Sequence, residues 1–223
     1  MGKNKLRRFE ENEHFTNVFQ PSYKEVQTNG FQLKGTWHTF FKNHHPITLE
    51  LGCGKGEYTV GQALQFPERN FIGVDVKGAR FWKGAKFATE NQMPNVAFVR
   101  TRIDQITHLF SQSENISEIW ITFPDPQPRE SKEKKRLTSP PFLDRYRIIS
   151  QPSTTINLKT DSIELFDYTL SVIHDQQLKI HEQSRDVYQD YPSHPILGIQ
   201  TFYESMWLKQ EKKIHYVKFN LFR

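Results

Sequence analysis

Short apolar runs alternate with segments of helical spacing from residue 46 onward, and this alternation is the strongest constraint on the fold. The apolar runs are ITLELG, NFIGVDV, NVAFVRT, EIWITF and TTINLKT. Between and after them lie TVGQALQF, GARFWKGAKFATEN, IDQITHLF, PPFLDRYRII and SIELFDYTLSVI. Repeated strand and helix units predict an α/β fold with a doubly wound, mostly parallel sheet, whose ligand site lies at the carboxyl ends of the strands.

The two ends of the chain have different patterns. The segments QLKIHEQS and KIHYVKFNLF alternate like strands, so we expect an antiparallel C-terminal edge hairpin whose long loop contains TFYE. Residues 1–45 are polar with basic residues near the start. For them the sequence predicts a partly flexible arm and a short helix near residues 36–43. Residues 46–223 are predicted to form one domain.

Composition limits the classes of protein that this chain can belong to. A single cysteine, Cys53, among 223 residues allows neither a disulfide framework nor a cysteine-based zinc site, and the histidines lack metal-binding spacing. No apolar run is long enough for a membrane span, and the start lacks the apolar core of a signal peptide. We therefore expect a cytoplasmic protein with no membrane association and no obligate metal. A formal net charge of +5 permits a polyanionic partner.

A glycine-rich turn, ELGCGKGEY at residues 50–58, follows the first apolar run. Its glycines Gly52, Gly54 and Gly56 form G-x-G-x-G, but Glu57 stands where the dinucleotide fingerprint has its third glycine. A hydride-transferring enzyme is therefore disfavoured. The turn suits a nucleoside ligand without a pyrophosphate, such as S-adenosylmethionine, although G-x-G-x-G alone also fits a purely structural turn.

Three acidic residues follow three successive predicted strands and match the polar groups of S-adenosylmethionine. Glu50 is placed for the methionyl ammonium, Asp75 for the ribose hydroxyls and Asp104 for the adenine amino group. Asp75 lies 23 residues after Gly52, close to the roughly 20 expected for a ribose-binding acid. Asp104 alone could also be a helix N-cap.

A further acidic residue, Asp125, lies between two prolines at the end of the run EIWITF. The sequence FPDPQPRESKEKKR then places a basic segment directly after it. A carboxylate held by prolines beside a cationic segment predicts a site that handles a polyanion near a fixed negative charge.

These motifs together resemble one family. The segments ELGCGKG, IGVDV, FPDP with its basic run, KTD and TFYE occur in the order found in bacterial tRNA (guanine-N7-)-methyltransferases. The resemblance runs from about residue 37 to the C-terminus. It implies a class I methyltransferase fold that uses S-adenosylmethionine to methylate N7 of guanine at position 46, in the variable loop of tRNA.

The resemblance also implies roles for individual residues. Asp125 matches an aspartate that is catalytic and contacts the substrate. The implied cofactor-binding residues are Glu50, Gly52, Gly54, Asp75 and Asp104, and the further substrate-binding residues are Arg129, Asp161, Thr201, Phe202, Tyr203 and Glu204. The chain departs from the family's usual FPDPWPKKRHNKRR: Gln127 replaces a Trp, Arg129 a Lys, Glu130 another base and Lys132 a His.

Guanine N7 carries an exposed lone pair, so its methylation needs no strong general base. We expect Asp125 to accept a hydrogen bond from the guanine edge and to offset the positive charge that develops on the purine. The basic residues are expected to hold tRNA phosphates; they are Arg129, Lys132, Lys134, Lys135 and Arg136. Two alternatives are a non-catalytic RNA-binding relative, favoured by Gln127, and a nucleotide-dependent oxidoreductase. The sequence leaves the oligomeric state open.

Overall fold

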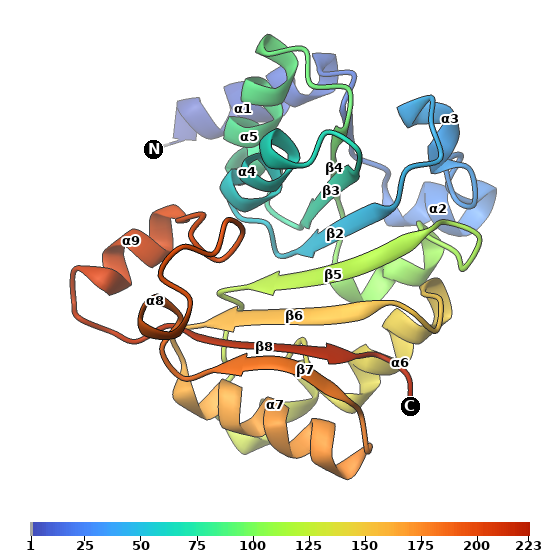
Figure 1. Cartoon of the computed structure of the whole chain (residues 1–223). Helices are drawn as coiled ribbons and strands as arrows, with labels where there is room; N and C mark the ends of the chain where they lie inside the picture. Colours follow the sequence, from blue (N-terminus) through green and yellow to red (C-terminus); the bar gives the residue numbers. More distant parts are fainter. Residues whose placement is uncertain (1) are drawn as a thin grey trace.

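The computed structural model describes residues 2–223, so Met1, the first residue of the predicted arm, lies outside it. Within this range the strands form one eight-stranded sheet in the order β1-β4-β3-β2-β5-β6-β8-β7 (Figure 1). The strands are β1 (Val18–Phe19), β2 (Ile47–Leu51), β3 (Asn70–Asp75), β4 (Val96–Arg100), β5 (Ile116–Thr122), β6 (Thr155–Thr160), β7 (Ile180–Ser184) and β8 (His215–Asn220).

Helices lie on both sides of this sheet. In Figure 1, α4 and α5 lie beside β3 and β4, with α1 packed against α5, whereas α7 lies beside β6 and β8. The helices are α1 (Gly2–His14), α2 (Tyr23–Asn29), α3 (Trp37–Phe41), α4 (Glu57–Gln65), α5 (Gly78–Glu90), α6 (Pro140–Ile149), α7 (Ile163–Asp175), α8 (Val187–Asp190) and α9 (Phe202–Leu208), with 3₁₀ helices η1 (Ile103–His108) and η2 (Glu130–Lys135).

The strand pairing confirms the predicted α/β fold. Strands β1 to β6 pair in parallel, while β8 is antiparallel to both β6 and β7. All residues of β2 and β3 are buried, as expected for central strands covered on both faces. The direction of the connections reverses between β2 and β5, and this switch point is where ligands bind in such sheets.

The segment before residue 46 contains more regular structure than the sequence predicts. The predicted short helix is present as α3, but α1, β1 and α2 precede it. Helix α1 is anchored because Asn12 Nδ2 donates to the Gly78 carbonyl at 3.0 Å, and α2 begins with a capping box between Ser22 and Glu25. Val18 pairs with Phe98 of β4, so this segment supplies an edge strand of the same sheet. The proposed domain boundary at residue 45 stays a prediction.

The connection between β7 and β8 also differs from the predicted loop, because it contains α8 and α9. Sequence TFYE, expected in a loop, instead begins α9, with Thr201 as N-cap. No helix in the described range has the length and apolar character required to cross a bilayer.

Candidate active site

Two cavities lie at the carboxyl ends of the central strands. The first, of about 80 Å³, is lined by residues of the glycine turn, by Glu50 and Asp75, and by Thr122, Phe123, Thr201 and Tyr203. The second, of about 520 Å³, is lined on one side by Thr101, Arg102 and Asp104, and also by Gln127, Lys135 and Phe142. Gly52 and Asp75 line both cavities, so the two form one continuous candidate site.

The glycine turn depends on the absence of side chains at one position in particular. Gly56 has φ 73°, and a Cβ atom there would lie 2.6 Å from the Phe98 ring and 3.3 Å from the Gly84 Cα. A side chain at residue 56 would therefore separate α4 from α5 and β4. Asp75 fixes the same turn from β3, because its Oδ2 accepts the Gly54 N–H at 3.0 Å and its Oδ1 accepts the Lys77 N–H at 2.8 Å.

Glu50 is a buried carboxyl at the floor of the first cavity. Only 2% of its surface is exposed, and its oxygens accept hydrogen bonds from the hydroxyls of Thr59 and Thr122. Burial raises the pKa of Glu50 to about 7, although these two hydrogen bonds oppose the shift. A cation in the cavity would favour the charged form of this residue.

Asp104 lies in the first turn of η1, where Arg102 occupies the N-cap position. The structure thus excludes the alternative that Asp104 is an N-cap. The Arg102 guanidinium donates to its carboxylate at 2.5 and 3.1 Å and holds the pKa of Asp104 below its usual range. The residue is half-buried and faces the second cavity.

Asp125 is exposed, on a loop with a strained backbone. Phe123 and Gln127 both have positive φ values, 48° and 46°, which are uncommon for residues other than glycine. The Phe123 N–H donates to the Lys159 carbonyl at 2.8 Å, and the Gln127 N–H donates to Asp125 Oδ1 at 3.0 Å. Phe123 lines the first cavity and Gln127 lines the second, so Asp125 belongs to the loop that contributes to the walls of both cavities.

The basic segment after Asp125 folds as η2. Arg129 and the lysines of this helix are exposed, and Lys135 lines the second cavity. Arg136 differs, because its Nε donates to the Gln127 carbonyl at 3.3 Å and its guanidinium lies 4.2 Å from the centre of the Tyr168 ring. We therefore infer that the main role of Arg136 is to hold the Asp125 loop in place.

Asp161 follows β6, the strand next to β5, and is half-buried. Its carboxylate forms an ion pair with Lys212 at 3.2 Å. No hydrogen bond joins Asp161 to Asp125 among residues 2–223. The two aspartates thus follow neighbouring strands without direct contact.

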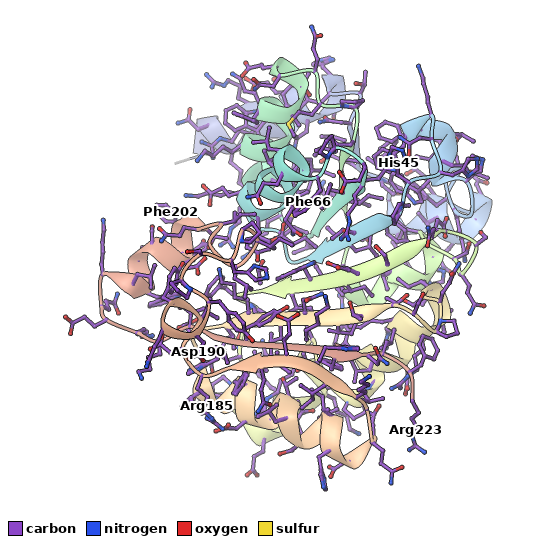
Figure 2. All side chains as sticks on the ribbon, in the orientation of Figure 1. His45, Phe66, Arg185, Asp190, Phe202 and Arg223 are labelled. Carbon is purple, nitrogen blue, oxygen red and sulfur yellow. The ribbon has the colours of Figure 1, made fainter. Side chains whose placement is uncertain are left out.

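The start of α9 covers the first cavity. Thr201 and Tyr203 line it, and the Phe202 N–H donates to the Glu57 carboxylate at 2.7 Å. Figure 2 shows Phe202 at the end of α9 nearest α4, and the Lys55 ammonium lies 3.1 Å from the centre of its ring. The glycine turn and α9 are therefore joined by direct contacts.

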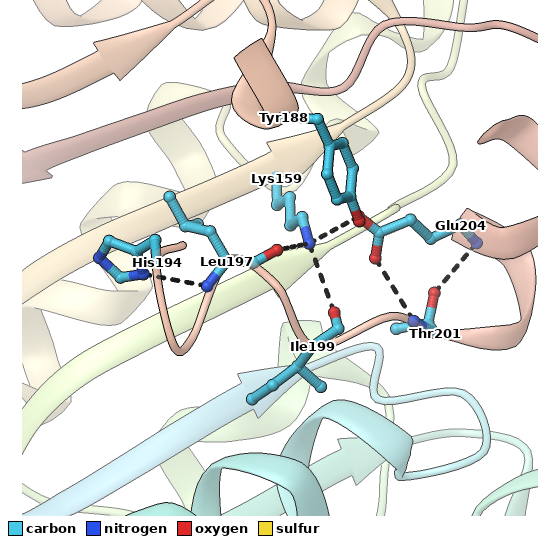
Figure 3. Close-up of polar contacts among 7 residues, drawn as sticks. All are labelled: Lys159, Tyr188, His194, Leu197, Ile199, Thr201 and Glu204. Atoms are coloured by element: carbon cyan, nitrogen blue, oxygen red, sulfur yellow. Dashed lines mark hydrogen bonds and ion pairs between the residues drawn. The ribbon is translucent and has the colours of Figure 1, made fainter. Parts of the chain in front are cut away.

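Glu204 lies at the third position of α9 and is completely buried. Its carboxylate forms a 2.6 Å ion pair with Lys159, accepts the Tyr188 hydroxyl at 2.8 Å and caps the Thr201 N–H (Figure 3). Lys159 is equally buried and also donates to the Leu197 carbonyl at 2.6 Å. With no exposed surface, Glu204 is assigned to holding α9 in place, in contrast to the predicted substrate contact.

Comparison with known proteins shows the family of this chain. A family model described as "Putative methyltransferase" matches residues 44–217. A tRNA (guanine-N(7)-)-methyltransferase of Christiangramia forsetii is 52% identical over 221 residues, covering 98% of each chain. The protein of the same name from Bacteroides thetaiotaomicron is 47% identical, covering 99% of this chain and 87% of its own length.

The chain belongs to the tRNA (guanine-N(7)-)-methyltransferase family.

The family membership confirms the resemblance drawn from the motifs, and with it a methyltransferase that uses S-adenosylmethionine. It argues against the oxidoreductase alternative.

Solved structures show the same fold at low identity. The 16S rRNA methyltransferase KamB aligns with a TM-score of 0.64 at 14% identity, covering 84% of this chain and 93% of that one. A 16S rRNA (adenine(1408)-N(1))-methyltransferase solved with SAM aligns with a TM-score of 0.56 at 13% identity, covering 84% and 90%.

Several residues that shape this methyltransferase site were not predicted. Thr59 and Thr122 bind Glu50, Glu57 binds the start of α9, and Lys159 binds Glu204. The sequence gives no signal for the burial of Lys159, since polar and apolar residues alternate in TTINLKT and Lys159 is at a polar position of this alternation. A lysine at a position where the strand is buried needs a buried partner. Among the described residues no group of histidine, cysteine or acidic side chains could hold a metal ion.

The buried Glu50 carboxyl makes folding stability depend on pH. Because its pKa is about 7 in the folded protein and near 4.5 when unfolded, the folded state binds the extra proton between these values. Stability from this residue is therefore full below about pH 4.5 and is lost as pH rises toward 7, by on the order of 3 kcal/mol. We expect Glu50→Gln to become more stable relative to the wild type over this interval.

Urea unfolding of both proteins at pH 5 and pH 8, without cofactor, measures this change. The difference between wild type and Glu50→Gln cancels other titrating groups, including the two histidines whose pKa is lowered by burial, His194 and His215. A difference that does not vary with pH contradicts the raised pKa of Glu50.

Proposed function

We propose that this protein transfers the methyl group of S-adenosylmethionine to N7 of guanine in tRNA, at position 46 of the variable loop. The observation that carries the proposal is the exposed Asp125 on a loop whose residues Phe123 and Gln127 line two cavities that share Asp75. The names of the relatives support the tRNA substrate and the N7 atom, and the motif resemblance supports position 46. Acting on tRNA, the protein is proposed to work in the cytoplasm.

The residues lining the cavities fit the cofactor. The buried Glu50 carboxyl lacks a cationic partner among the described residues, which suits the methionyl ammonium. Asp75 stands at the junction of the two cavities, where the ribose would lie between the methionyl and adenine groups. Asp104 faces the larger cavity and would accept the adenine amino group. Gly52 and Gly54 allow the backbone to approach the ligand.

The bound cofactor supplies an electrophilic methyl group on a sulfonium. The residues of the chain must then hold guanine N7 in line with that methyl group and stabilise the positive charge on the purine. Asp125 is proposed to do both, and two observations support this: one of its oxygens accepts the Gln127 N–H, and the residue is exposed. Thr201 and Tyr203 line the first cavity, Phe202 lies between them at the start of α9, and Asp161 follows the neighbouring strand β6. All four are proposed to contact the substrate.

The exposed cations of η2 are proposed to bind tRNA phosphates next to the second cavity. Arg129, Lys132 and Lys134 are exposed, and Lys135 lies at the cavity itself. Phosphate contacts of this kind supply affinity and orientation, whereas the guanine is selected by the site between the cavities.

Transfer of labelled methyl from S-adenosylmethionine to an unmodified tRNA transcript tests the function. The matched control is the same transcript with adenine in place of the variable-loop guanine. We expect label in the first transcript only, mapped to N7. Label in both transcripts contradicts the assigned nucleotide, and binding of S-adenosylmethionine without any transfer supports a non-catalytic RNA-binding relative.

A further inference from the structure

A third cavity, which is strongly cationic, lies next to α1 and the start of α5. It has a volume of about 520 Å³ and five basic side chains along its lining, with no carboxylate. The basic residues come from α1, from the start of α5 and from the end of β4: Lys5, Arg8, Lys77, Arg80 and Arg100. Three segments far apart in the sequence thus bring positive charge to one concave surface.

These charges are not neutralised by neighbours. Within the part of the chain that the structure describes, none of the five residues forms an ion pair, while the nearby Glu11 and Glu57 pair with Arg7 and Lys83. Burial lowers the pKa of the adjacent Lys55 ammonium; Glu57 opposes this shift, whereas the cations Lys83, Arg8 and Arg80 add to it. Unpaired cations at this density indicate an anionic partner.

Two of the guanidinium groups are held in place before any ligand binds. The Arg8 guanidinium lies 4.7 Å from the centre of the Trp82 ring, and that of Arg100 lies 4.6 Å from the centre of the Phe9 ring. Trp82 is itself fixed, because its Nε1 donates to Glu11 at 2.6 Å. Stacking reduces the conformational entropy that these side chains lose when they bind an anion.

The cavity is continuous with the cofactor site. Arg80 lines both the cationic cavity and the first cofactor cavity, and Val76 lines both the cationic cavity and the second. Lys135 of η2 lines the second cofactor cavity as well. The cofactor site therefore has η2 on one side and the cationic cavity on the other.

We propose that this cationic cavity is a second phosphate-binding surface for tRNA, which holds the RNA backbone on the α1 and α5 side of the cofactor site. The inference rests on the proposed function. An RNA that presents one guanine to the cofactor carries its backbone away from that nucleotide in two directions. Cationic surfaces on both sides of the site can then bind phosphates from the same molecule.

The test is a double substitution, Lys5→Gln with Lys77→Gln. Both side chains are exposed and form no ion pair or hydrogen bond among the described residues, so the change removes charge with little effect on packing. The matched control is Lys42→Gln with Lys179→Gln. These two exposed lysines precede β2 and β7, at the amino ends of the strands, whereas the site lies at the carboxyl ends. Both variants lower the formal net charge of +5 by two.

Binding of the unmodified tRNA transcript is measured by fluorescence anisotropy at several salt concentrations. We expect the Lys5/Lys77 variant to bind roughly tenfold more weakly near 0.1 M salt, with a plot of log affinity against log salt that is shallower by about 1.4–1.8. The control should match the wild type, and calorimetry should show unchanged binding of S-adenosylmethionine in both variants.

An equal effect of the two double substitutions overturns the inference, and so does a slope equal to that of the wild type. Methyl transfer by the wild type is measured in parallel. If the wild type methylates the transcript but the slope is unchanged, the inference alone fails. If the slope changes as expected but no methyl is transferred, the surface binds tRNA and the proposed catalytic function fails.

Discussion

Replacement of Asp125 by Asn is expected to lower kcat for tRNA methylation by about 10²–10³-fold, the loss typical when one preorganised electrostatic group is removed from a transition state. The substitution keeps the size of the side chain and an oxygen that can accept the Gln127 N–H, so the loop is expected to keep its conformation. What it removes is the negative charge that stabilises the methylated purine. Binding of S-adenosylmethionine should be unchanged, because Asp125 lines neither cofactor cavity.

Single-turnover methyl transfer at saturating tRNA measures this effect separately from RNA binding. Asp175→Asn is a suitable control, since Asp175 is an exposed aspartate at the C-terminal end of α7. Turnover within a few-fold of the wild type in a folded Asp125→Asn protein contradicts the catalytic role. A raised KM for tRNA with unchanged kcat assigns Asp125 to uniform substrate binding instead.

Replacement of Lys159 by Met is expected to destabilise the fold by about 3–5 kcal/mol, because it leaves the Glu204 carboxylate buried without its cation. Met keeps the length and apolar stem of the lysine. The Lys159→Met/Glu204→Gln protein should recover a large part of this loss. The glutamine amide at position 204 is neutral, and its oxygen can still accept the Thr201 N–H of the capping box.

Urea unfolding of the two variants measures both free energies. Lys218→Met serves as the control, because Lys218 lies on the neighbouring strand β8 and its contact with Glu118, at 3.9 Å, is partly exposed. It should cost less than about 1 kcal/mol. If Lys159→Met costs no more than this control, or if Glu204→Gln gives no recovery, the buried pair is not what stabilises α9 in its position.

Local sequence patterns predicted the central sheet well. Each of the runs that lead to Glu50, Asp75 and Asp125 is a buried strand, and the glycine turn follows β2 as expected. These features succeed because they depend on periodicity and on turn residues close together in the chain. The placement of the acids at one edge then follows from the parallel arrangement of the strands.

The remaining features depend on contacts between distant residues, which periodicity does not report. The polar sequence of helix α1 predicts a partly flexible arm, yet the helix is fixed to α5 by contacts between residues far apart in the chain, such as Asn12 with Gly78. The pairing of Lys159 with Glu204 spans the whole of α7, β7 and α8. The positive φ of Gln127 likewise depends on the folded loop and on Arg136, whose Nε donates to the Gln127 carbonyl.

The hydrogen bond from the Phe202 N–H to Glu57 gives the two substrates a shared element. Glu57 begins α4 directly after the glycine turn, whereas Phe202 begins α9, the segment proposed to contact tRNA. A ligand that moves one of these segments also changes the binding affinity of the ligand at the other segment. By thermodynamic linkage, each ligand changes the affinity for the other by the same factor. If tRNA displaces the start of α9, it will alter the affinity for S-adenosylmethionine by the same factor by which S-adenosylmethionine alters the affinity for tRNA. The size of this mutual effect would then depend on one carboxylate, that of Glu57 at the first position of α4.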